Sequence, residues 1–210
     1  MVVEIMTEES KTAYEERYKE NSYYWGKKPS GFAIKVLEYL PAADSTTLID
    51  IGCGEGRNAV FFARNGYIVT AYDAALTGVE KTKQLAKEAG VSLDIFQEDM
   101  TEFRLKNQYD IIFAHGVLQY LPTTIREEFF ENLKINTRKN GINVLSVFVH
   151  KPFIPKSPDG EKTSHHYKSG ELFTYYHDWQ LEYCTEEIFD CNSSGIWHKH
   201  AVNKMIARKI

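Results

Sequence analysis

One segment constrains the fold of this chain more than any other: residues 48–57, with the sequence LIDIGCGEGR. An apolar run there is followed by three glycines at alternate positions, Gly52, Gly54 and Gly56. Residues 58–64 then have the pattern of a helix. Glycines allow turns and close approaches that a Cβ would block, and the first turn of a helix presents unpaired N–H groups. This succession of strand, turn and helix predicts an α/β protein with a nucleotide-cofactor site at the turn.

The details of the turn favour a cationic cofactor over a dinucleotide. A dinucleotide-binding turn has its third glycine where this chain has Arg57. Asp50 and Glu55 place acid beside the turn, which repels a pyrophosphate and attracts a cation. S-adenosylmethionine (SAM) carries a sulfonium and an ammonium and no phosphate. Asp73 ends a second apolar segment about 20 residues on, where a carboxylate can accept hydrogen bonds from both ribose hydroxyls. The alternative is a strand–helix turn with an incidental acid.

Apolar and amphipathic segments alternate along most of the chain. We expect helices at residues 7–19, 31–40, 58–64, 76–89 and 124–139, and strands at 47–51, 68–73, 92–97, 109–114 and 142–149. A short helix at 169–177 and two strands at 179–185 and 198–208, joined by a polar turn, follow. This order predicts an α/β fold: a doubly wound, Rossmann-like, seven-stranded and mostly parallel sheet with helices on both faces and a C-terminal antiparallel strand.

Length and composition favour a single domain. Of the 210 residues 43% are hydrophobic, enough for a full core. We expect an N-terminal helical cover at residues 1–45, a cofactor-binding core at 46–149, and a substrate-side loop with the C-terminal hairpin at 150–210.

Charge and cysteine usage indicate the partners and the compartment. The net charge is −4 with acids and bases interspersed, so no basic stripe for a nucleic acid is present and a small-molecule partner is expected. No apolar run has the length of a membrane span, and residues 1–9 lack the pattern of a signal peptide. Three cysteines without paired spacing fit a reducing compartment. We therefore expect a cytoplasmic protein. The expected oligomeric state is a monomer or a homodimer.

With these motifs the chain resembles the class I SAM-dependent methyltransferases, and within them the tellurite-resistance-type (TehB-like) branch. The resemblance rests on residues 48–58, on residues 66–73 (GYIVTAYD), and on the C-terminal segments 168–172 (KSGEL), 175–179 (YYHDW) and 205–209 (MIARK). It implies transfer of a methyl group from SAM, with S-adenosylhomocysteine (SAH) as the product.

The resemblance also implies roles for single residues in the cofactor site. The three glycines, with Cys53 between them, would let the methionine part of SAM lie against the backbone, and Asp50 would hold its cationic end directly or through water. Asp73 would bind the ribose. The remaining cofactor residues would be Asp99 and Met100 at the adenine, the Ala114 carbonyl at the ammonium, and His115 beside the methyl-transfer cavity.

Each of these assignments has a structural alternative. Cys53 is more simply a small residue that fills a tight space than a nucleophile. Asp99 is also a favoured N-cap for the turn at residues 101–103. His115 is the tentative catalytic residue, and an oriented structural histidine is its alternative.

Two departures from known patterns bear on the acceptor. Residues 114–117 read AHGV, without the Asn/Asp-Pro-Pro-aromatic sequence of enzymes that methylate the amino groups of nucleic-acid bases. The last hairpin lacks the His-Arg pair of the tellurite-resistance branch, so the resemblance does not extend to tellurite as the acceptor.

Aromatic residues are the candidates for the substrate walls. Tyr23, Tyr24 and Trp25 are expected to face the cofactor, where a ring can attract the sulfonium, and Phe153, Tyr167 and Trp197 are weaker substrate or lid candidates. The alternative is that such aromatics, with Tyr14 and Tyr18, only pack the first helix onto the sheet.

Methyl transfer from SAM needs alignment and exclusion of water more than acid–base chemistry. A thiol, a chalcogen oxyanion or another soft nucleophile needs little more, whereas an oxygen or nitrogen nucleophile usually needs a base. The candidate bases are the histidines at 115, 150, 165, 166, 198 and 200. No metal site is expected, because the adjacent His165 and His166 lack further convergent ligands. A catalytically silent SAM-binding regulatory module and an NAD-dependent oxidoreductase are the alternative functions.

Overall fold

The computed structural model describes residues 8–157, 165–192 and 195–210. The helices are α1 (Glu8–Tyr18), α2 (Gly31–Tyr39), α3 (Arg57–Arg64), α4 (Leu76–Ala89), α5 (Arg126–Ile135) and α6 (Glu171–Thr174), with short 3-10 turns η1 (Leu118–Tyr120) and η2 (Thr123–Ile125). The strands are β1 (Thr47–Ile51), β2 (Ile68–Asp73), β3 (Asp94–Gln97), β4 (Tyr109–His115), β5 (Thr137–Val149), β6 (Gln180–Cys191) and β7 (His198–Arg208).

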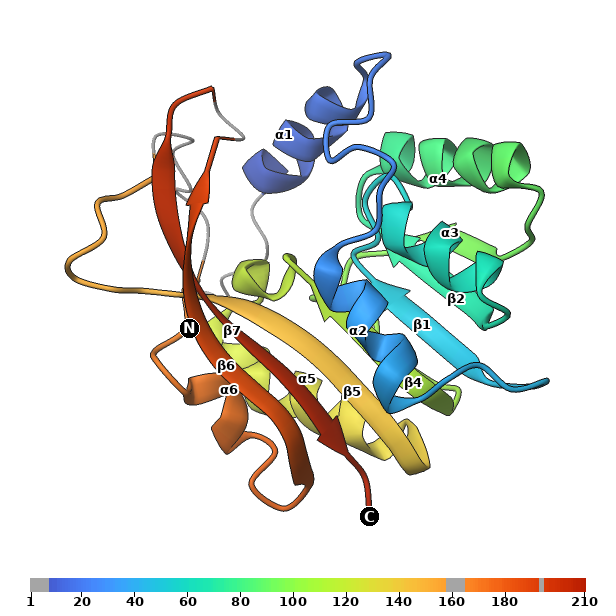
Figure 1. Ribbon diagram of the computed structural model, residues 1–210. Helices are drawn as coiled ribbons and strands as arrows, with labels where there is room; N and C mark the ends of the chain where they lie inside the picture. Colours follow the sequence, from blue (N-terminus) through green and yellow to red (C-terminus); the bar gives the residue numbers. More distant parts are fainter. Residues whose placement is uncertain (1–7, 158–164, 193–194) are drawn as a thin grey trace.

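All seven strands form one sheet in the order β3-β2-β1-β4-β5-β7-β6. Strands β1 to β5 pair in parallel, and β7 runs antiparallel to both of its neighbours. In Figure 1, β6 and β7 curve away from the rest of the sheet, and their hairpin end stands opposite α1. The predicted doubly wound fold with one reversed C-terminal strand is confirmed.

The inner strands carry apolar side chains to both faces of the sheet, because helices cover both. On β4, Phe113 packs with Phe32 of α2 and Phe62 of α3 on one face. The neighbouring Ile112 packs on the other face with residues of α5 and α6, among them Phe130. This two-sided burial explains the near-continuous apolar runs of a parallel sheet.

The predicted helix at 124–139 is too long. Helix α5 ends at Ile135, and Thr137 already pairs with Tyr109 as the first residue of β5. The pair at 140–141 therefore does not end a helix: Asn140 adopts a left-handed φ of 63° within the strand and donates its N–H to the Lys209 carbonyl. No side chain caps the start of α5.

The C-terminal hairpin is longer than predicted. Strand β6 continues to Cys191, six residues beyond the expected end, because its whole length pairs with β7. The helix expected at 169–177 is the single turn α6. Residues 193–194 of the expected turn, residue 7 of the expected first helix and residues 158–164 of the substrate-side loop lie outside the described residues.

None of the helices in the described part of the chain is long and apolar enough to cross a membrane.

Candidate active site

One cavity of about 540 Å³ runs along the carboxyl ends of the parallel strands. We call one part of it the cofactor half, lined by Gly52, Gly54, Asp73, Glu98, Asp99 and Met100 from the loops after β1, β2 and β3. The acceptor half is lined by His115, Ser146, Phe148, Glu187, His200 and Lys204 from β4, β5, β6 and β7. Ligand pockets span roughly 300–1,000 Å³, and ligands of open α/β sheets bind at this edge.

Asp73 holds the glycine turn in place. Its Oδ2 accepts from the Gly54 N–H at 2.7 Å, and its Oδ1 accepts from the Ala75 N–H at 2.9 Å. The Cys53 N–H donates to the Tyr72 carbonyl, so the turn after β1 is tied to the end of β2 at two points. A carboxylate has about four acceptor positions, so these backbone bonds leave acceptor capacity on Asp73 for a hydroxyl group in the cavity.

The carboxyl group of Asp73 is hard to ionise. Burial raises its pKa to about 6, although the backbone N–H groups of Ala75 and Gly54 oppose the shift. A ligand that donates hydrogen bonds to this carboxylate stabilises its ionised form and therefore binds better above pH 6 than below it.

The glycines have different roles, and the expectation for Gly56 is wrong. Gly52 and Gly54 line the cavity, and Gly56 does not. A Cβ on Gly56 would lie 2.5 Å from Cγ2 of Thr82, and its φ of 85° is left-handed. Gly56 is therefore needed to pack α3 against α4.

Two acids near the turn do not present negative charge to a ligand as expected. Glu55 is buried and pairs with Lys81 Nζ at 2.8 Å. Asp50 is buried, and it is absent from the cavity lining. Burial, followed by the charge of Asp73, raises the pKa of Asp50 well above its ordinary value, and its Oδ2 has no hydrogen-bond partner among the described residues. The structure thus places no Asp50 atom at the cavity, and its contact with a cofactor, direct or through water, stays a prediction.

Cys53 lines the cavity but has the properties of a space-filling residue. Its side chain is buried, and burial together with Asp73 raises the pKa of its thiol well above the ordinary value. A thiol that stays protonated is a poor nucleophile.

Asp99 and Met100 both line the cavity, as predicted for the adenine site. Asp99 also makes the alternative contacts: its Oδ1 accepts from the Thr101 N–H at 2.8 Å and from the Thr101 hydroxyl at 2.9 Å. Its Oδ2 pairs with Lys11 Nζ of α1 at 2.5 Å. An adenine amino group at this position would share Asp99 with Lys11.

His115 lines the cavity at the end of β4, whereas Ala114 is fully buried and does not. The His115 Nδ1 lies 2.7 Å from the Ser146 hydroxyl, which also accepts from the Gly116 N–H at 3.2 Å. Burial, followed by the charges of Arg57 and Lys204, lowers the pKa of His115 to about 4. The ring is therefore neutral near pH 7 and a weak base. The expectation that the Ala114 carbonyl faces the cavity is wrong, because the edge of the cavity begins one residue later.

Helix α1 covers the cavity through polar contacts with several elements. The Tyr14 hydroxyl lies 2.8 Å from that of Tyr120, and the Glu15 carboxylate accepts from the Thr77 N–H at 3.3 Å in the first turn of α4. Tyr14 and Tyr18 line the cavity, so these two tyrosines do more than pack the helix onto the sheet.

Of the three aromatic residues at 23–25, only Trp25 lines the cavity. Its indole N–H donates to the Tyr18 hydroxyl at 3.3 Å. Tyr23 packs beside α3 and α4 and donates to the Lys81 carbonyl, and Tyr24 meets the Trp25 ring edge to face with the Arg17 guanidinium over its own ring. The expectation that Tyr23 and Tyr24 face the cofactor is wrong, because these contacts point both rings elsewhere.

The weaker aromatic candidates do not line the cavity either. Phe153 and Trp197 are 71% and 72% exposed. Tyr167 is fully buried beneath the Arg126 guanidinium, whose carbon lies 3.5 Å from the ring centroid. The prediction is wrong for Tyr167, which belongs to the core, whereas Phe153 and Trp197 project to solvent and their substrate or lid role stays a prediction.

Most of the acceptor half escaped the sequence analysis. Alternate residues of the hairpin strands face the cavity: His200, Val202 and Lys204 on β7, and Glu187 and Phe189 on β6. Lys204 and Glu187 form an ion pair of 2.5 Å. The period-two spacing of these residues was the available signal, but the pattern alone does not say which face of a terminal strand meets a cavity.

The cavity fits SAM in two respects. The Asp73 carboxylate lines it with acceptor positions left, and Gly52 and Gly54 put no side chain between the turn and the cavity. A Cβ on Gly54 would lie 2.9 Å from the Tyr18 hydroxyl, which shows how closely the cover meets the turn.

Comparisons with known proteins agree on the kind of protein. The family model for tellurite resistance protein TehB matches residues 17–199. A probable SAM-dependent methyltransferase TehB of Haemophilus influenzae is 24% identical over 91% of this chain and 68% of its own length. A ubiquinone biosynthesis O-methyltransferase of Rickettsia canadensis is 26% identical over 62% of this chain, which spans only 61% of that enzyme. The crystal structure of Haemophilus influenzae TehB superposes with a TM-score of 0.77 at 20% identity, over 95% of this chain and 67% of that one.

Proposed function

Because the chain belongs to the TehB family, we propose that it transfers a methyl group from SAM to a small-molecule acceptor with a soft nucleophile, such as a thiol or a chalcogen oxyanion. When bound, SAM supplies a methyl group already activated by its sulfonium. The chain's own residues then have to hold the two molecules in line and exclude water, and orientation of this kind supplies much of the acceleration in such reactions.

In this proposal the cofactor half binds the nucleoside and methionine parts of SAM. Asp73 accepts from the ribose hydroxyls, and Asp99 and Met100 contact the adenine. The backbone at Gly52 and Gly54 carries the methionine part. Support comes from the joint position of these residues on one side of the cavity and from the acceptor positions left on Asp73.

The single observation that carries the soft acceptor is the weak basicity of His115. With a pKa of about 4, the ring is ill suited to take a proton from a hydroxyl or an ammonium near neutral pH. An acceptor that is already ionised needs no such base. His115, oriented by Ser146, then serves as a polar wall of the cavity.

The proposal extends to the partners and the compartment. A small molecule fits the size of the cavity, and all three cysteines are free, which suits a reducing compartment such as the cytoplasm.

The test is SAH release from SAM with a panel of thiol, chalcogenide, amine and hydroxyl acceptors. We expect turnover with thiols or chalcogenides, and we expect the rise of rate with pH to follow the acceptor's own pKa. The same rise should persist in His115→Asn. A rise of the rate near pH 6–7 that is the same for all acceptors and disappears in His115→Asn would contradict the proposal. Binding of SAH without turnover on any acceptor would indicate a silent SAM-binding module instead.

A further inference from the structure

Three potential metal ligands meet at the end of the hairpin that borders the acceptor half. Cys191 ends β6 and pairs in register with His198 of β7, and His200 lies two residues further along β7. One ligand atom from each residue lies within 4.8 Å of the other two. Cys191 and His200 also line the cavity. The sequence predicts no metal site, because Cys191 and His198 are brought together only by the register of the hairpin.

The hydrogen bonds around His198 prepare its Nε2 atom for a metal. His198 Nδ1 lies 2.7 Å from the Ile196 carbonyl, which can only accept, so the proton of a neutral His198 is on Nδ1. Its Nε2 then carries a lone pair. That atom lies 2.9 Å from Nε2 of His200, so the His200 nitrogen is the donor in this pair. An Nδ1–H bonded to a carbonyl is the usual support of a metal-binding histidine.

The spacing suits a tetrahedral ion after small side-chain movements. With Zn–N near 2.0 Å and Zn–S near 2.3 Å, neighbouring ligand atoms in a tetrahedron are roughly 3.3 to 3.6 Å apart. The observed 2.9 Å between the nitrogens and the upper limit of 4.8 Å for the cluster bracket that range. The His200 ring is held by Phe148, on which it stacks with centroids 4.7 Å apart.

We propose that Cys191, His198 and His200 bind Zn²⁺ and leave its fourth position open toward the acceptor half of the cavity. Three protein ligands with one open position are typical of zinc sites that bind a substrate. Binding moves the His200 proton from Nε2 to Nδ1 and releases the Cys191 thiol proton to solvent, so that the site gains a thiolate and two neutral imidazoles.

The open position would anchor a remote donor group of the acceptor rather than the atom that receives the methyl group. His200 lies four residues from Lys204 on β7. Lys204 lies opposite Ser146 of β5 in the strand register, and Ser146 is the hydrogen-bond partner of His115. Four residues of strand span about 13 Å. The acceptor would thus carry a second, metal-binding group such as a thiolate or carboxylate, an identification that rests on the proposed function.

Cobalt(II) is the probe for this site in the full-length, metal-stripped protein. We expect one cobalt ion per chain, with the visible absorption of a tetrahedral site and a thiolate-to-cobalt charge-transfer band, both removed by an excess of Zn²⁺. Cys191→Ser should lose the charge-transfer band, and His200→Gln should weaken binding by at least about tenfold. Cys184→Ser is the matched control, because Cys184 is an exposed cysteine on the same strand; it should retain both signals.

Two further readouts make the test decisive. A small thiol added to the cobalt protein should change the visible spectrum, since an open position exchanges its ligand. Absence of the charge-transfer band in the wild type, its persistence in Cys191→Ser, or a spectrum insensitive to added thiol would overturn the proposal. SAH-induced thermal stabilisation, measured in parallel, reports whether each variant is folded and tests the methyltransferase proposal independently of the metal.

Discussion

Replacing Gly56 by alanine should destabilise the protein far more than the same change at a comparable glycine in open space. A Cβ at Gly56 would lie 2.5 Å from Cγ2 and 2.6 Å from Oγ1 of Thr82, whose side chain is fully buried. The left-handed backbone costs an alanine about 1–2 kcal/mol, and overpacking of this kind costs about 1–3 kcal/mol more. The expected loss in the free energy of unfolding is therefore about 2–5 kcal/mol.

The control is Gly90→Ala at the end of α4. Gly90 has a similar φ of 67°, and nothing lies within 4 Å of the position of its Cβ. Only the cost of the left-handed backbone applies to Gly90→Ala, so we expect the free energy of unfolding to fall by about 1–2 kcal/mol. For a chain of this size 1 kcal/mol corresponds to about 2–4 °C in the melting temperature.

Urea denaturation followed by circular dichroism measures both changes. The difference between the two variants isolates the contact of Gly56 with Thr82. If Gly56→Ala loses no more stability than Gly90→Ala, then Gly56 is not a packing residue, and a direct role at the cofactor has to be restored to it.

Two further predictions concern the cofactor half and the core. SAH affinity, measured by calorimetry, should fall by up to about tenfold per pH unit as the pH drops below 6. The reason is that the ligand binds the ionised form of Asp73, whose pKa is about 6. This pH dependence should be absent in Asp73→Asn, and an unchanged dependence in that variant would contradict the assignment. Arg126→Met should lower the free energy of unfolding by about 3–5 kcal/mol, because it leaves the Glu171 carboxylate and the His165 carbonyl without their buried partner. Arg104→Met, at a more exposed ion pair, should lower it by under about 1 kcal/mol. Equal losses for the two variants in urea denaturation would refute this reasoning.

The fold and the family could be predicted because their signals are local. The apolar run of β1, the glycine turn and the acid at Asp73 lie close together in the sequence, and each follows from backbone geometry. The family resemblance drawn from them is confirmed by the match over residues 17–199. The early start of β5 could not be predicted from the sequence, because its first residues are polar and are held by partners distant in the chain. Arg138, for example, forms an ion pair with Asp110.

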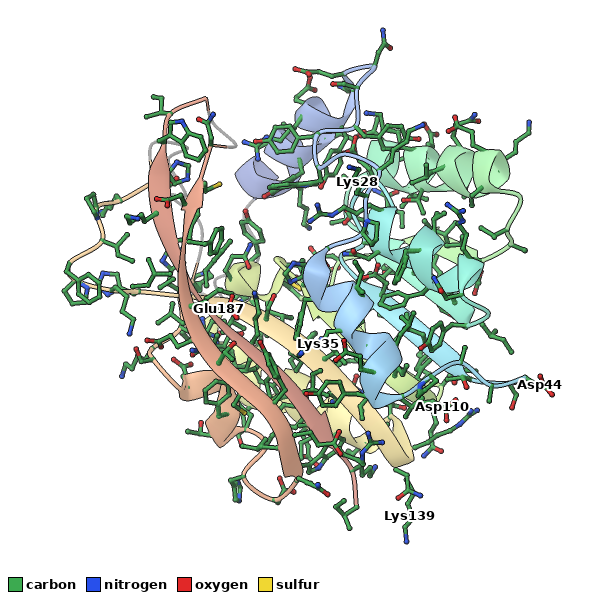
Figure 2. All side chains as sticks on the ribbon, viewed as in Figure 1. Lys28, Lys35, Asp44, Asp110, Lys139 and Glu187 are labelled. Atoms are coloured by element: carbon green, nitrogen blue, oxygen red, sulfur yellow. The ribbon has the colours of Figure 1, made fainter. Side chains whose placement is uncertain are left out.

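The walls of the cavity were harder to predict, because sequence shows where aromatics are dense but not where they point. Tyr23 and Trp25 are two residues apart, yet only Trp25 lines the cavity. Charge was misleading for a similar reason: Glu55 is adjacent to the glycines, but Lys81 of α4 neutralises it. Figure 2 shows Glu187 on the hairpin, a residue whose place in the cavity follows only from the curvature of β6 and β7.

The most direct test of a SAM site at the glycine turn is the thermal shift produced by SAH in the wild type, in Asp73→Ala and in Asp44→Ala. Asp44 is exposed and lies at the opposite end of the sheet from α1 (Figure 2), so its variant is the matched control. At a hundredfold excess of SAH over its Kd, binding stabilises the fold by about 2.7 kcal/mol, or about 5–11 °C. We predict this shift in the wild type and in Asp44→Ala, and its near-complete loss in Asp73→Ala. No shift in the wild type, or an undiminished shift in Asp73→Ala, would contradict the account.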